Sequence, residues 1–192
     1  MSSIGIIGGT FNPVHFGHLI TAQAIKEIRH LGKIIFIPCN ISPHKKDNLD
    51  NNPLHRYKMV QRAIEGIDGF EVSDYEIKKG GISYTIDTLK EFKKKYSNIE
   101  LIIGFDNLLK FDSWQEPDNI LELAKLVVMK RKIDKVPTQR NRYYNRAIIV
   151  NTPLIEINAT DIRHRVSEGL LVDFLVPEKV KEYIYNFKLY RN

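Results

Sequence analysis

The stretch that decides the fold is residues 5–18, which read GIIGGTFNPVHFGH. Its apolar start is typical of a buried strand, and the paired glycines Gly8 and Gly9 interrupt that strand at a turn. After the turn two histidines, His15 and His18, stand three positions apart where a helix begins. Free backbone N–H groups, a helix N-terminus and two imidazoles then meet at one point, and such a point attracts phosphate. The stretch therefore predicts a phosphate-binding strand–turn–helix unit.

Short apolar stretches alternate with amphipathic stretches along the rest of the chain. The expected strands are Ile4–Gly8, Lys33–Pro38, an edge strand within Phe70–Ile77, Glu100–Gly104, Lys125–Lys130 and Arg146–Val150. The expected helices are Phe16–His30, Pro53–Ile67, Tyr84–Tyr96, Asp118–Ala124, Thr160–Glu168 and Pro177–Phe187. This alternation favours an α/β fold, a Rossmann-like parallel sheet with helices on both faces, and ligand binding beyond the carboxyl ends of the strands. The length suits a single domain, residues 1–192, on which the closing helices from about residue 160 pack.

Composition excludes some classes of protein and leaves others open. The net charge of +6 favours either a nucleic-acid surface or a basic cleft for polyanionic small molecules, but aromatic residues do not interleave with Lys and Arg as in a base-stacking platform. Cys39 is the only cysteine, so no internal disulfide can form, and its place after a strand is typical of inert packing. No apolar run approaches the ~20 residues of a membrane span, and no basic leader precedes the first strand. We expect a soluble cytoplasmic protein that binds neither membranes nor nucleic acid.

The histidine pair also fits a metal site or a helix cap. Residues three apart share one face of a helix, as metal ligands do. Structural zinc takes four ligands, however, and no cysteine or histidine follows at a suitable spacing: His44, His55 and His164 are scattered. We therefore expect no metal held by these residues, and capping or surface histidines stay as the alternative to phosphate contacts.

Further short motifs follow in order along the chain. They are Ser42-Pro43-His44-Lys45, Gly80-Gly81-Ile82-Ser83-Tyr84-Thr85, Ile103-Gly104-Phe105-Asp106, Trp114 and Ile157-Asn158-Ala159-Thr160-Asp161-Ile162-Arg163. Together with residues 8–18, this set resembles the nucleotidyltransferase superfamily that carries the H-x-G-H signature, and within it the nicotinate-nucleotide adenylyltransferases. The H-x-G-H signature alone is a weak signal, whereas the ordered set covers nearly the whole chain and is specific.

The resemblance implies adenylyl transfer from ATP to nicotinate mononucleotide, which yields deamido-NAD and pyrophosphate in NAD biosynthesis. On this basis the expected catalytic residues are His15, His18, Lys45, Thr160 and Arg163. The expected ATP contacts are Gly8, Gly9, Thr10, Phe11, Gly104, Asp106, Arg131 and Asn158, and the expected contacts with nicotinate mononucleotide are Asn12, Thr85 and Trp114. Mg²⁺ is expected to arrive with the ATP phosphates. The family pattern is I-S-x-T-x-I-R, and Asn158 stands at its serine position, where it can still cap a helix although it offers no hydroxyl.

Simpler roles stand beside several of these assignments. Lys45 also fits a solvated loop charge, and Arg163 also fits a surface arginine on an ordinary capped helix. Trp114 also fits a packing residue, and Asp106 fits a plain helix cap. For these four residues the sequence alone leaves both roles open.

The choice of the second substrate depends on Thr85, which is expected to open a helix. A helix N-terminus favours a carboxylate over a neutral amide by ~0.3–1 kcal/mol, and by up to ~2 kcal/mol when partly buried. This supports nicotinate mononucleotide over nicotinamide mononucleotide by only several-fold. The motifs at residues 42–45 and 80–85 disfavour phosphopantetheine, the substrate of another sister family. The sequence is compatible with a homo-oligomer and does not decide the oligomeric state.

Overall fold

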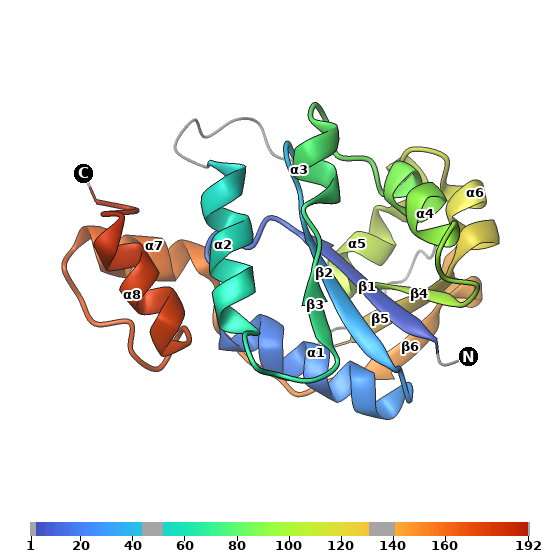
Figure 1. Ribbon diagram of the computed structural model, residues 1–192. Helices are drawn as coiled ribbons and strands as arrows, with labels where there is room; N and C mark the ends of the chain where they lie inside the picture. The colour runs from blue at the N-terminus through green and yellow to red at the C-terminus, as the bar shows by residue number, and fades with distance from the viewer. Residues whose placement is uncertain (1–2, 44–51, 131–140, 192) are drawn as a thin grey trace.

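The computed structural model describes residues 3–43, 52–130 and 141–191. Its centre is a six-stranded, all-parallel sheet with the strand order β3-β2-β1-β4-β5-β6 (Figure 1). The strands are β1 (Ile4–Gly9), β2 (Lys33–Pro38), β3 (Phe70–Val72), β4 (Ile99–Gly104), β5 (Lys125–Lys130) and β6 (Ile148–Asn151). The Rossmann-like parallel sheet expected from the sequence is confirmed.

The central strands of the sheet are buried on both faces, which explains why β2 is almost continuously apolar. Successive side chains of a strand point to opposite faces. In β2, Ile34 and Phe36 accordingly pack into one core, whereas Ile35 and Ile37 pack into the other. The sheet is thus the middle layer between two apolar cores.

Helices cover both of these cores. They are α1 (Phe16–Ile28), α2 (Pro53–Ala63), α3 (Tyr75–Lys79), α4 (Thr85–Lys93), α5 (Phe105–Leu109), α6 (Pro117–Leu123), α7 (Ala159–Ser167) and α8 (Glu178–Asn186), with short 3-10 turns at Phe111–Ser113 and Tyr144–Arg146. Side chains of α1, α2, α7 and α8 join one core, and those of α4, α5 and α6 join the other. Figure 1 shows α2, α7 and α8 on one side of the sheet and α4 and α6 on the other. Within the described ranges no helix has the length and apolarity to cross a membrane.

The structure differs from the sequence expectation in several element bounds, among them those at α3, α5 and β6. The strand expected within Phe70–Ile77 ends at Val72, and α3 follows it, with Asp74 paired to Lys78 four positions on at 3.0 Å. α5 is absent from the expectation because its five residues are too few to show a helical period. β6 starts two residues later than expected, because a 3-10 turn occupies its expected start.

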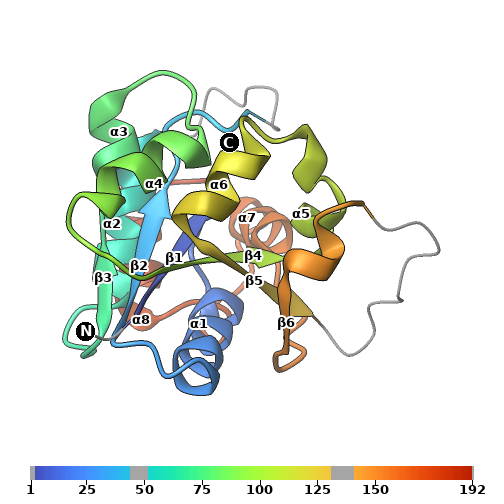
Figure 2. The ribbon, with the colours of Figure 1, turned by 90° about the vertical axis from the view of Figure 1, so that its right-hand side faces the viewer.

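The strand order places a topological switch point between β1 and β4. β1 pairs with β2 on one side and with β4 on the other, so the chain first leaves β1 toward one edge of the sheet and later builds the other half (Figure 2). Loops at the carboxyl ends of two such strands diverge and leave a crevice, where ligands bind in open α/β sheets. The residues that follow Gly9 and Gly104 lie at this crevice.

Candidate functional site

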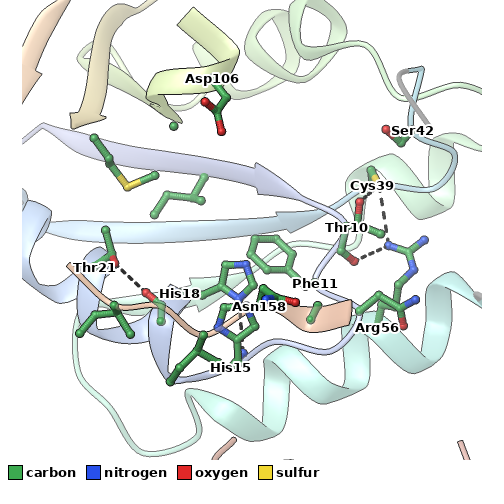
Figure 3. A pocket seen from close by; sticks show the side chains of 18 of the residues that line it. Thr10, Phe11, His15, His18, Thr21, Cys39, Ser42, Arg56, Asp106 and Asn158 are labelled. Carbon is green, nitrogen blue, oxygen red and sulfur yellow. Dashed lines mark hydrogen bonds between the residues drawn. The ribbon is translucent and has the colours of Figure 1, made fainter. Parts of the chain in front are cut away.

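A cavity of about 730 Å³ opens at the switch point (Figure 3). Its walls come from the β1–α1 turn, the segment after β2, the start of α5 and the segment that leads into α7. The predicted site residues that line it are Thr10, Phe11, Asn12, His15, His18, Gly104, Asp106, Asn158 and Arg163. In Figure 3 Asp106 extends from the side opposite the two histidines. The structure therefore brings most of the described site predictions into one place.

The β1–α1 turn is shaped around the buried ring of Phe11. Phe11 has φ +49°, a left-handed conformation that is uncommon for a bulky residue. Its ring makes edge-to-face contacts with Phe36 and His18, at centroid distances of 5.7 and 5.1 Å. Gly9 leaves room for this ring, because a Cβ there would lie 2.9 Å from it. Neither Gly8 nor Gly9 has a positive φ. The missing side chain at Gly9 therefore serves close packing against Phe11 and not a left-handed backbone conformation.

His15 and His18 form a close pair at the start of α1. His15 is the N-cap residue, and its backbone N–H donates to Nδ1 of His18 at 3.3 Å. The two ring centroids lie 3.7 Å apart. Gly17 leaves room for the ring of His15, because a Cβ there would make a tight contact of 3.0 Å with Nδ1 of His15. The H-x-G-H spacing therefore holds two imidazoles side by side on the cavity wall.

Burial decides the charge of His15. Its exposed fraction is 6%, and its Nδ1 has no hydrogen-bond partner among the described residues. Burial lowers the pKa of His15 from 6.5 to about 4, because the imidazolium form loses its hydration. At pH 7 His15 is consequently neutral and offers one N–H donor rather than a positive charge.

The start of α7 forms another wall of the cavity. Asn158 caps this helix, since its Oδ1 accepts a hydrogen bond from the backbone N–H of Asp161 at 2.9 Å. Arg163 donates from Nη1 to the carbonyl oxygen of Asn12 at 2.8 Å and from Nη2 to Oγ1 of Thr160 at 3.3 Å. The first of these bonds ties α7 to the β1–α1 turn. The N-terminal ends of α1 and α7 thus line the same cavity, where their dipoles favour an anion.

Three predicted ATP-binding or catalytic residues do not line the cavity: Gly8, Gly9 and Thr160. The two glycines end β1 immediately before the lining begins. Thr160 is the second residue of α7, because the helix begins one residue earlier than expected. Two further predictions, Lys45 and Arg131, fall outside the residues that the structure describes.

Thr85 and Trp114, the other predicted contacts of the mononucleotide, do not line the cavity either. Thr85 is the first residue of α4, as the sequence predicts, and is half-buried. The segment before it is tied to the cavity wall, because the backbone N–H of Asn40, a lining residue, donates to Oγ of Ser83 at 2.8 Å. Trp114 is half-buried, and its ring centroid lies 5.1 Å from that of Phe111. Trp114 therefore has the packing contact that the sequence leaves as an alternative.

Sequence reasoning missed Arg56, a buried arginine of α2 that lines the cavity. Its guanidinium donates to the carbonyl oxygen of Thr10 at 2.9 Å and to that of Asn40 at 3.0 Å, and Sγ of Cys39 lies 3.8 Å from Nη1. Burial lowers the pKa of Arg56. Because the two carbonyls follow β1 and β2, Arg56 fastens these neighbouring segments together. The available signal was helical spacing, since Arg56 shares the buried face of α2 with Met59.

Tyr190 is a second residue that sequence reasoning missed. Its hydroxyl donates to Oδ1 of Asn12 at 2.6 Å across 178 positions of the chain. A contact this distant leaves no periodic or motif signal, so only the folded chain reveals it.

The described residues offer little to a metal ion on their own. Within residues 3–43, 52–130 and 141–191, no group of three or more His, Cys, Asp or Glu side chains could hold one. Among the acidic residues of these ranges, Asp106 lines the cavity. A magnesium ion fits this chemistry only if ligand oxygens supply most of its coordination, which is how it commonly binds with nucleotides.

Comparison with known proteins adds a family to this geometry. Residues 6–165 match the family model described as cytidylyltransferase-like. The chain therefore belongs to the cytidylyltransferase-like family. The match includes both the β1–α1 turn and the start of α7, the two elements that meet at the cavity.

Individual relatives narrow the class further. The chain is 42% identical over 204 residues to the Clostridium beijerinckii protein named "Probable nicotinate-nucleotide adenylyltransferase", with 100% of both chains covered. Among solved structures it is similar to Plasmodium falciparum nicotinic acid mononucleotide adenylyltransferase, complexed with APC (TM-score 0.75) and with NaAD (TM-score 0.72). Each of these two matches is 18% identical and covers 99% of this chain and 98% of that chain, which is a likeness of fold.

Proposed function

We propose that this chain is a nicotinate-nucleotide adenylyltransferase, which transfers the adenylyl group of ATP to nicotinate mononucleotide and releases pyrophosphate. The observation that carries the proposal is the cavity at which the starts of α1 and α7 meet, joined by the hydrogen bond from Arg163 to Asn12. Two helix N-termini at one point suit a polyphosphate. The name of the 42%-identical relative supports this choice of substrates. The product, deamido-NAD, places the reaction in NAD biosynthesis.

The reaction needs no general base. A phosphate oxygen of nicotinate mononucleotide attacks the α-phosphorus of ATP, the bond from that phosphorus to the bridging oxygen breaks, and pyrophosphate leaves with the electron pair. A phosphate monoester has a second pKa of about 6, so the attacking group is largely a dianion at neutral pH. The work of the protein is positioning and stabilisation of charge on the phosphate oxygens.

The proposed phosphate contacts come from the two helix starts. His18 and His15 donate to phosphate oxygens of ATP, with His18 as the stronger candidate for catalysis. The N–H groups at the start of α7 and the forked guanidinium of Arg163 receive the β- and γ-phosphates. The remaining proposed ATP contacts are Gly8, Gly9, Thr10, Phe11, Gly104, Asp106, Arg131 and Asn158, and the remaining proposed catalytic residues are Lys45 and Thr160.

The proposed mononucleotide contacts are Asn12, Thr85 and Trp114. The first turn of α4, with the hydroxyl of Thr85, would receive the nicotinate carboxylate, because a helix N-terminus favours an anion. Trp114 would stack on the pyridine ring. Nicotinamide mononucleotide lacks this negative charge, so it is the rival substrate that tests the assignment.

We infer that ATP enters with a divalent cation, and we propose Mg²⁺. Bound to ATP, the ion would neutralise charge on the phosphates. Asp106 is the acidic residue that lines the described cavity wall, so its carboxylate is the side chain available there to bind the ion. We also propose that the chain works as one domain, residues 1–192, in the cytoplasm. Side chains of α7 and α8 share a core with α1 and α2, which supports the single domain.

Pyrophosphate release tests the proposal directly. The purified chain is supplied with ATP, Mg²⁺ and, in separate reactions, nicotinate mononucleotide, nicotinamide mononucleotide or phosphopantetheine. We expect pyrophosphate together with deamido-NAD, identified by mass, at the highest kcat/KM with nicotinate mononucleotide. Omission of the divalent cation, with a chelator present, should abolish release. Turnover with nicotinamide mononucleotide alone, or with no mononucleotide, would overturn the substrate assignment.

A further inference from the structure

Asn12 accepts hydrogen bonds at both its main-chain and its side-chain oxygen. Its main-chain carbonyl oxygen accepts a hydrogen bond from Nη1 of Arg163 at 2.8 Å. Its side-chain oxygen, Oδ1, accepts one from the hydroxyl of Tyr190 at 2.6 Å. Asn12 lines the cavity between the β1–α1 turn and α7, so these two bonds fix a residue of the site itself.

Tyr190 reaches this position through an unusual backbone path after α8. Lys188 and Tyr190 have φ values of +51° and +64°, in the left-handed region that residues with a Cβ seldom occupy. Such conformations persist when surrounding contacts hold them, and they gather at functional sites. The hydroxyl of Tyr190 also lies 3.9 Å from Sδ of Met59 on α2. Burial raises the pKa of the Tyr190 phenol, against the opposing effect of Arg163 and Arg56.

The direction of the Asn12 amide follows from this bond. An asparagine side chain has an acceptor end and a donor end. The phenol of Tyr190 is neutral and donates its one hydrogen to Oδ1, which leaves the two N–H bonds of Nδ2 for another partner. Among the described residues Nδ2 has no hydrogen-bond partner that would compete with a ligand, and Asn12 lines the cavity. With Tyr190 in place, Asn12 therefore presents a hydrogen-bond donor.

We propose that Tyr190 is a positioning residue that orients the amide of Asn12, so that Nδ2 donates to a phosphate oxygen of the mononucleotide. The inference rests on the proposed function, because it assigns Asn12 to the mononucleotide. An oxygen anion is the matching ligand chemistry, since a donor pair next to two helix N-termini suits a phosphate. The phosphate is shared by nicotinate and nicotinamide mononucleotide, whereas the carboxylate belongs to the first alone.

The variant Tyr190→Phe removes the hydroxyl and keeps the ring. The loss of one hydrogen bond that orients a ligand contact corresponds to about a five-fold effect. We expect the KM for nicotinate mononucleotide to rise about five-fold, with the KM for ATP and kcat within two-fold of the wild type. Tyr185→Phe is the matched control, because Tyr185 lies on α8 with its ring 5.5 Å from the Arg191 guanidinium, whereas the hydroxyl that binds Asn12 belongs to Tyr190.

A double-mutant cycle separates positioning from a general structural effect. Asn12→Ala should raise the KM for the mononucleotide, and Tyr190→Phe added to it should raise that KM no further, because the amide to be oriented is gone. Independent effects that multiply in the double variant would overturn the inference. The unchanged KM for ATP serves as the check that each variant is folded.

Parallel measurements with nicotinamide mononucleotide identify which ligand oxygen accepts the hydrogen bond from Nδ2 of Asn12. A similar fold-change in KM with both mononucleotides supports the phosphate, whereas a change confined to nicotinate mononucleotide assigns Asn12 to the carboxylate and overturns the phosphate assignment. A rise in the KM for ATP alone overturns it as well. A wild type without turnover overturns the proposed function and this inference together, whereas an active wild type with an unchanged Tyr190→Phe KM overturns only the inference.

Discussion

The two groups of proposed binding residues are held in different ways. We call Thr10, Phe11, Asn12, His15, His18, Asn158 and Arg163 the phosphate side, and Thr85 and Trp114 the pyridine side. On the phosphate side the residues hold one another, through the paired imidazoles, the ring of Phe11 against His18 and the bond from Arg163 to Asn12. On the pyridine side the residues come from two separate segments, and neither lines the cavity. Under the proposed function, the difference teaches that the phosphate contacts would be organised before substrate arrives, whereas the choice of substrate would depend on residues outside the cavity lining.

The largest expected effect comes from breaking the phosphate side at His18. His18→Ala should lower kcat by about 10²- to 10³-fold, because a donor aimed at developing charge contributes most in the transition state. The KM for ATP should change far less. Steady-state kinetics check this, with His164→Ala as the control because His164 is exposed near the end of α7 and does not line the cavity. An unchanged kcat in His18→Ala would remove His18 from the mechanism.

A smaller effect is expected from Arg163→Lys, which keeps the charge and removes the fork. Hydrogen bonds to charged groups contribute about 1.5–3 kcal/mol, so kcat/KM for ATP should fall by about 10- to 100-fold. The bridge to the carbonyl oxygen of Asn12 is lost with the fork. Arg165→Lys is the matched control on the same helix, since Arg165 donates to the carbonyl oxygen of Leu171 instead. Equal activities of the two variants would show that the α7 bridge has no catalytic role.

Acid should lower the free energy of unfolding of the protein through protonation of His15. The pKa of about 4 in the folded state lies below the unfolded value of 6.5, so between these values the unfolded state binds more protons. Folding stability attributable to His15 is therefore complete above pH 6.5 and falls as the pH drops toward 4, by at most about 1.4 kcal/mol per pH unit.

Urea unfolding at pH 7 and pH 5 measures this loss, and the difference between the wild type and His15→Gln isolates it from other titrating groups. The wild type should lose more stability on acidification than the variant, by up to about 2 kcal/mol. Identical losses would contradict the neutral, buried state assigned to His15.

The smallest effect is expected on the pyridine side. Thr85→Val removes a hydroxyl at the start of α4 and should raise the KM for nicotinate mononucleotide by several-fold, in line with the strength of helix-terminus contacts. The kcat and the KM for ATP should stay near the wild-type values, and the preference over nicotinamide mononucleotide should shrink. Thr85→Ser, which keeps the hydroxyl, should behave as the wild type. A large loss of kcat in Thr85→Val would erase the contrast between the two sides.

Most of the fold could be predicted because its strands carry the pattern of a doubly covered sheet. Residues 33–38 are continuously apolar after the first lysine, and the structure buries both faces of that strand. Elements of five residues, such as α3 and α5, could not be predicted, because a helical period shows only over a longer stretch of sequence.

In the candidate site, short-range features could be predicted from the sequence and long-range contacts could not. Local chemistry predicted the turn around Gly9, the histidine pair and the cap at Asn158, because each is a short-range feature of backbone and side chain. Arg56 and Tyr190 could not be predicted, since their roles arise from contacts with carbonyl and amide oxygens of distant segments. Trp114 is assigned to the mononucleotide by resemblance alone. In the structure its ring packs against Phe111.

The bond between Tyr190 and Asn12 has a practical consequence for handling the protein. A purification tag or fusion partner joined after residue 192 would begin three positions beyond Tyr190, whose hydroxyl binds Asn12 of the β1–α1 turn. Recombinant material for kinetics or inhibitor screening should therefore carry its tag at the other end of the chain. Under the proposed function, inhibitors that bind the segment after α8 would affect the proposed site from outside the cavity.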